Sequence, residues 1–218
     1  MKKYSSILFS MIVALSLENA FFRLCKLQGY DVVFFSYIVI ILSVIPRFFL
    51  GNLIHYNNTH DYKLADIFHK KFGVKCKAMV SALFDFYVCL IEFGILTLIT
   101  NNIGNFKKFV TFLLALSGLD VVWHIGIFRG QSSEDAQKAS PTWVVINILT
   151  LCYCLLLLYS TTAKISDVWY LATSIVYVGA AIADFLLNIP FYLEISIKNS
   201  PTEGSINTSP TNVRMQGL

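Results

Sequence analysis

The feature that most constrains this chain is the alternation of long apolar stretches with short polar ones. Six apolar stretches follow one another, and each is close to the roughly 20 residues that a helix needs to cross the hydrocarbon core of a bilayer. They run over about 6–24, 32–54, 78–100, 109–128, 143–159 and 168–195. The sequence therefore predicts an all-α fold, a polytopic membrane helix bundle of about six transmembrane helices.

Composition agrees with a chain that lies mostly in lipid. The 218 residues are 56% hydrophobic and 14% charged, whereas soluble domains carry roughly a quarter charged residues. The net charge of +4 is too small to suggest a nucleic-acid-binding protein. No direct nucleic acid binding is expected, and the main partner is the lipid bilayer itself.

Lysine and arginine are unevenly distributed between the two sides of this predicted bundle. Lys2, Lys3 and the lysine-rich stretch 63–77 fall on one side, with Lys138 and Lys198. Because positively charged loops stay in the cytoplasm, we expect both termini inside, in the cell (inner) membrane.

Two segments stand apart from the predicted helices. Residues 56–77 combine near-helical apolar spacing with basic positions, which is typical of an amphipathic helix on the cytoplasmic surface. Lys63, Lys70 and Lys71 would then contact lipid or a cytosolic protein partner. Residues 199–218 are rich in Ser, Thr, Pro, Asn and Gly and predict a flexible polar tail. The bundle is thus expected to occupy residues 1–198.

Polar residues inside the apolar stretches are the candidate functional residues. Each central charge costs roughly 2.5–3.5 kcal/mol on insertion scales, so it usually faces the bundle interior or a partner. Depth along each stretch predicts one group from the middle to the inner half of the membrane: Arg47, Asp85, Asp120, His124, Asn147, Asp184 and Asn188. Two further carboxylates, Glu18 and Glu92, are expected in the outer half.

Three interpretations of this polar group remain open. It could hold the helices together through ion pairs and hydrogen bonds. It could form an ion or proton path, because carboxylates and a histidine in series suit proton relay. It could also hold a catalytic metal, but there is one intramembrane histidine and no HExxH pair. We therefore expect no metal, no cofactor and no catalytic residue.

The sequence favours a membrane protein without a separate enzyme domain, since no polar segment is long enough to form one. The first hypothesis is a homo-oligomeric channel-like or sensing subunit that couples to a cytosolic partner. The alternative is a small ion- or proton-coupled transporter, and the second alternative is an intramembrane metal-dependent enzyme.

Overall fold

The computed structural model describes residues 2–27, 31–58, 77–127, 134–160, 166–189 and 192. These residues form long α-helices and no strand. The helices are α1 (Lys2–Cys25), α2 (Val32–Asn58), α4 (Lys77–Asn101), α5 (Phe106–Ile127), α6 (Glu134–Ser160) and α7 (Asp167–Leu187). The chain is therefore a helical membrane bundle, as predicted.

Five of the described helices are long and apolar enough to cross a membrane, with apolar stretches that include Ile7–Cys25 in α1 and Val32–Asn52 in α2. The remaining helix, α4, has an apolar stretch over Phe86–Asn101 within a helix of 25 residues. At 1.5 Å per residue, 25 residues extend about 37 Å, which exceeds the hydrocarbon thickness of roughly 30 Å.

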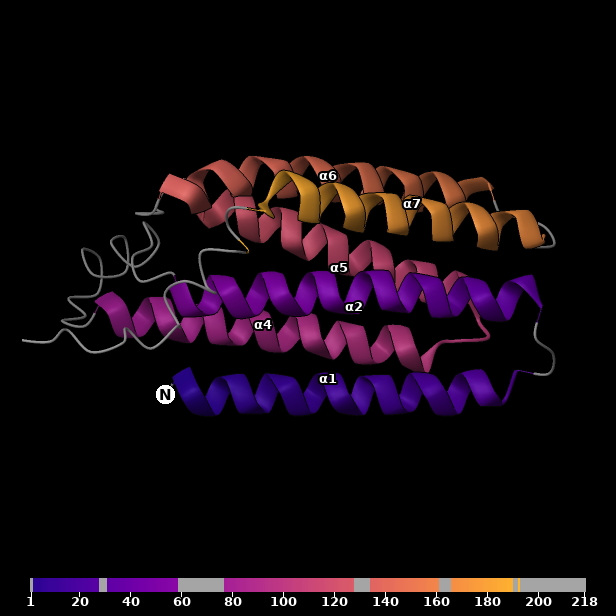
Figure 1. Cartoon of the computed structure of the whole chain (residues 1–218), viewed down its shortest axis with the longest axis horizontal. Helices are drawn as coiled ribbons and strands as arrows, with labels where there is room; N and C mark the ends of the chain where they lie inside the picture. Colours follow the sequence, from indigo (N-terminus) through magenta and orange to yellow (C-terminus); the bar gives the residue numbers. More distant parts are fainter. Residues whose placement is uncertain are drawn as a thin grey trace, which may run out of the picture.

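The helices run alternately in opposite directions, so α1 begins and α7 ends on the same side of the bundle (Figure 1). The main packing partners are α1 with α4, α2 with α7, and α5 with α6. In Figure 1, α1 lies at one edge of the bundle and α2 near the centre.

On the side of the bundle opposite the N-terminus, local interactions explain where the helices begin and where the chain turns. The Asp31 carboxylate accepts a hydrogen bond from the backbone N–H of Phe34 at 3.0 Å, and the Asn105 side chain accepts one from Lys108 at 3.2 Å. Both side chains satisfy backbone donors in the first turn of a helix. Between α4 and α5 the chain turns at Gly104, whose φ of 91° favours glycine.

Two helix boundaries differ most from those that the sequence predicts. Helix α6 begins at Glu134, nine residues before the predicted start, because its first turns are helical but polar. Helix α7 ends at Leu187 instead of continuing to 195. Asn188 donates its backbone N–H to the Asp184 carbonyl, and Pro190 follows two residues later, where proline interrupts a helix.

Small polar side chains connect the helices within the bundle. Ser16 and Thr97 are hydrogen-bonded at 2.8 Å between α1 and α4, and Thr150 donates to Ser117 at 3.2 Å between α6 and α5. Such interhelical hydrogen bonds stabilise membrane helices because lipid offers no alternative partner.

The predicted surface segment 56–77, with Lys63, Lys70 and Lys71, lies outside the described residues, except that 56–58 end α2 and Lys77 begins α4. The predicted tail 199–218 also lies outside them.

Candidate functional site: a buried polar network

An ion pair between α2 and α7 forms one half of the site. Arg47 Nε lies 2.8 Å from Asp184 Oδ2, and both side chains are almost fully buried. Asp184 also accepts hydrogen bonds from Trp143 Nε1, from Asn188 Nδ2 at 2.7 Å and from the Tyr192 hydroxyl at 3.4 Å. The Asp184 charge is thus both paired and extensively hydrogen-bonded, as a buried carboxylate requires.

Asn147 on α6 connects this ion pair to a second carboxylate. Its Oδ1 accepts a hydrogen bond from Arg47 Nη2 at 2.8 Å, while its Nδ2 donates to Asp120 Oδ2. An amide can do both because it carries an acceptor and two donors. Asn147 is completely buried and therefore joins α2, α5 and α6 through a single side chain.

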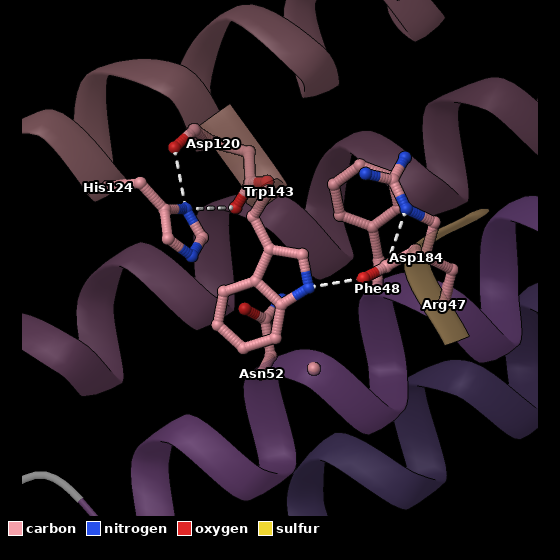
Figure 2. A pocket seen from close by; sticks show the side chains of 8 residues that line it. Arg47, Phe48, Asn52, Asp120, His124, Trp143 and Asp184 are labelled. Atoms are coloured by element: carbon pink, nitrogen blue, oxygen red, sulfur yellow. Dashed lines mark hydrogen bonds and ion pairs between the residues drawn. The ribbon is translucent and has the colours of Figure 1, made fainter. Parts of the chain in front are cut away.

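Asp120 and His124 lie one turn apart on α5 and contact each other. His124 Nδ1 lies 3.1 Å from Asp120 Oδ1 and 2.9 Å from the Asp120 backbone carbonyl oxygen. Both acceptors place the proton of the imidazole on Nδ1. The ring of Trp143 lies against that of His124, with centroids 5.0 Å apart, so the aromatic ring separates His124 from Asp184 (Figure 2).

Glu92 on α4 completes the network. It is 1% exposed and accepts a hydrogen bond from Asn52 Nδ2 of α2, and Asn52 lines the same small cavity as Asp120. Its second oxygen, Oε1, is buried and has no hydrogen-bond partner among the described residues. Two carboxyl groups thus lie next to each other inside the bundle.

The sequence predicts Glu92 in the outer half of the membrane, and the structure gives its level along the bundle. Thr97 contacts Ser16, which lies at the centre of the apolar stretch Ile7–Cys25 of α1. Glu92 precedes Thr97 by five residues, which places it about 7.5 Å from that level, toward the N-terminal side of the bundle. Helix α4 begins further out on that side than its neighbours (Figure 1), and this axial offset brings Glu92 to the level of Asp120.

A small cavity lies between the two halves of the network. Its volume is about 20 Å³, and its lining residues are Arg47, Phe48, Gly51, Asn52, Asp120, His124, Trp143 and Asp184. This volume suffices for about one water molecule. Arg47 Nη1 is buried and has no hydrogen-bond partner among the described residues, so the guanidinium retains a free donor beside the cavity.

The charges of this network do not balance if every group is in its usual state. Glu92, Asp120 and Asp184 are three acids, whereas Arg47 is one permanent cation and His124 a conditional one. Even with His124 protonated, one carboxylate lacks a counter-charge. In a medium where an isolated charge is so costly, a bound proton is the simplest compensation.

The remaining predicted residues are placed as follows. Asp85 lies on α4, and its side chain is outside what the structure describes. Glu18 lies on an exposed face of α1, away from the network. Among the described residues, no group of three or more His, Cys, Asp or Glu side chains could hold a metal ion.

Three members of the network were not predicted from the sequence: Asn52, Trp143 and Tyr192. Asn52 carries the same signal as the predicted residues, because it is an amide near the end of an apolar stretch. Trp143 and Tyr192 are aromatic residues that the sequence places equally well at the membrane interface. Only the fold shows that both donate hydrogen bonds to Asp184.

Comparison of the chain with models of protein families, with curated proteins and with solved structures finds no match.

Proposed function

We propose that this protein is a small membrane transporter that carries protons across the bilayer and in which Glu92, Asp120 and His124 bind the proton. The observation that supports this most directly is the pair of neighbouring carboxyl groups, Glu92 and Asp120, buried next to an imidazole. Carboxylates and histidines arranged in series are typical of proton relays in membrane proteins.

The network also offers a way to couple proton binding to helix movement. Arg47 is bonded directly to Asp184 and, through Asn147, to Asp120. Loss of a proton from the Glu92–Asp120 pair adds a negative charge on one side of Arg47 and therefore weakens its preference for Asp184. A single guanidinium with a free Nη1 beside the cavity can then shift between the two carboxylate groups.

The geometry favours this function over an open channel. The cavity at the polar network holds about one water molecule, whereas conduction through the network would need a continuous hydrated path. With the expected N-in orientation, the network lies in the cytoplasmic half of the membrane. We propose the cell membrane as its location, with proton exchange toward the cytoplasm.

The test is proton uptake by liposomes that contain the purified protein and a trapped pH indicator. Under an imposed membrane potential, wild-type liposomes should acidify faster than protein-free liposomes. Glu92→Gln and Asp120→Asn should lower the protein-dependent rate by about tenfold or more, because an amide cannot release a proton.

Asp167→Asn is the matched control, since Asp167 is an exposed carboxylate in the first turn of α7 and should leave the rate unchanged. Size-exclusion profiles and circular dichroism establish that each variant is folded. The proposal is wrong if wild-type liposomes acidify no faster than empty ones, or if the folded Glu92→Gln variant acidifies them as fast as wild type.

A further inference from the structure

The small cavity in the polar network has walls that both donate and accept hydrogen bonds. Its volume is about 20 Å³, and Arg47, Asp120 and Asp184 are among the residues that line it (Figure 2). Arg47 is 5% exposed, and its Nη1 is a buried donor without a hydrogen-bond partner among the described residues. The two carboxylates supply acceptors. Because a buried donor that lacks a partner is costly, the cavity is suited to a ligand that accepts a hydrogen bond from Arg47.

Size and charge together select the chemistry of this ligand. A water molecule needs about 10–15 Å³ of such space and two to four polar partners, and the cavity offers both. An anion beside Arg47 would also lie beside the carboxylates of Asp120 and Asp184, and a metal cation would lie beside the guanidinium group. The walls therefore favour a neutral ligand no larger than water that both accepts and donates hydrogen bonds.

The cavity extends from the carboxyl groups toward the N-terminal side of the bundle. Gly51 follows Arg47 by four residues on α2, and His124 follows Asp120 by four residues on α5. Both helices run toward the N-terminal side (Figure 1). Four residues of a helix extend about 6 Å, so the lining residues Gly51 and His124 lie nearer to that side. A proton that approaches from there reaches the cavity before it reaches Asp120.

We propose that this cavity binds one water molecule, which accepts a hydrogen bond from Arg47 Nη1 and carries protons between the N-terminal side of the bundle and Asp120. As the water oxygen takes up a proton from that side, one of its own O–H bonds breaks, and the released proton bonds to a carboxylate oxygen of Asp120. The reverse steps release the proton, and no electron is transferred. The proton-carrying role rests on the proposed transport, whereas the binding of water does not.

Gly51→Ala tests the site because it adds a methyl group to the cavity wall and removes no polar group. Gly51 lines the cavity, and within 4 Å a Cβ there would meet only the Tyr192 hydroxyl oxygen, at 3.9 Å. Alanine also favours a helix over glycine, so the variant is expected to fold. Gly94→Ala is the matched control, because nothing lies within 4 Å of a Cβ at Gly94 and Gly94 does not line the cavity.

Infrared difference spectra between neutral and high pH detect the water directly. When a neighbouring carboxyl group loses its proton, the O–H stretching band of a bound water changes, and this band shifts in water that carries the heavy oxygen isotope. We expect such an isotope-sensitive band in the wild type and in Gly94→Ala, but not in Gly51→Ala. Gly51→Ala should also lower the rate of proton uptake by liposomes about tenfold or more, while the carbonyl band of the protonated carboxyl group remains.

A wild-type spectrum without an isotope-sensitive band, or a Gly51→Ala variant that keeps this band, would overturn the proposal. Loss of the band in Gly51→Ala at an unchanged rate of proton uptake would overturn the proton-carrying role. Failure of the proposed transport would look different. Wild-type liposomes would then acidify no faster than empty ones, although the isotope-sensitive band is present and is lost in Gly51→Ala.

Discussion

At the scale of single residues, Asp184 accepts hydrogen bonds from four side chains: Arg47, Trp143, Asn188 and Tyr192. Buried polar groups in proteins are hydrogen-bonded, and these four donors satisfy the Asp184 carboxylate away from water. Asp120 is bonded to Asn147 and His124, and the carboxyl group of Glu92 is bonded to Asn52. The network thus contains one fixed ion pair and one pair of carboxyl groups suited to proton exchange.

Arg47→Met should destabilise the protein by about 3–5 kcal/mol, because it leaves the buried Asp184 charge without its cation. Asp184→Leu should do the same by isolating Arg47. The double variant should lose less than the sum of the two, since neither charge then remains. Thermal unfolding in detergent measures all three, and Lys108→Met, at an exposed position, should be neutral. Additive losses in the double variant would show that the pair does not couple.

At the scale of helices, the apolar pattern predicts most of the fold because lipid requires long apolar stretches. The start of α2 at Val32 agrees with the prediction, and α4 differs by one residue at each end. The pattern does not reveal the polar first turns of α6. It also does not give the axial offset of α4, since sequence fixes depth only along each helix. This offset explains why Glu92 belongs with Asp120.

Packing between α5 and α6 positions Asp120 and His124 against Asn147, and it depends on a small residue. A Cβ at Gly118 would lie 3.4 Å from Leu151 Cδ1 of α6. Gly118→Leu should therefore push the helices apart, cost about 1–3 kcal/mol and weaken the Asn147–Asp120 hydrogen bond. Thermal unfolding tests the loss of stability. Gly94→Leu is the matched control, because nothing lies within 4 Å of a Cβ there. Equal effects of the two substitutions would contradict this explanation.

At the scale of the whole molecule, the alternating helices bring the start of α1 and the end of α7 to the same side of the bundle (Figure 1). The polar network lies toward that side. The lysine distribution predicts that this side is cytoplasmic. The network would then face the cytoplasm.

Cysteine labelling from outside intact cells tests this orientation. A cysteine at Asn102, in the turn after α4, should react with a membrane-impermeant maleimide. A cysteine at Gln131, between α5 and α6, should react only after the membrane is permeabilised. The reverse pattern would place the termini outside and the network in the outer half of the membrane.

The measurement that most directly tests the central claim, a proton held by the buried Glu92–Asp120 pair, is infrared spectroscopy of the protein in liposomes. A protonated carboxyl group absorbs at a carbonyl frequency distinct from that of a carboxylate. We predict such a band at neutral pH in the wild type, its loss at high pH, and its absence from the difference spectrum of Glu92→Gln. The band should persist in Asp167→Asn. A wild-type spectrum without a protonated carboxyl band, or one that Glu92→Gln and Asp120→Asn leave unchanged, would contradict the account.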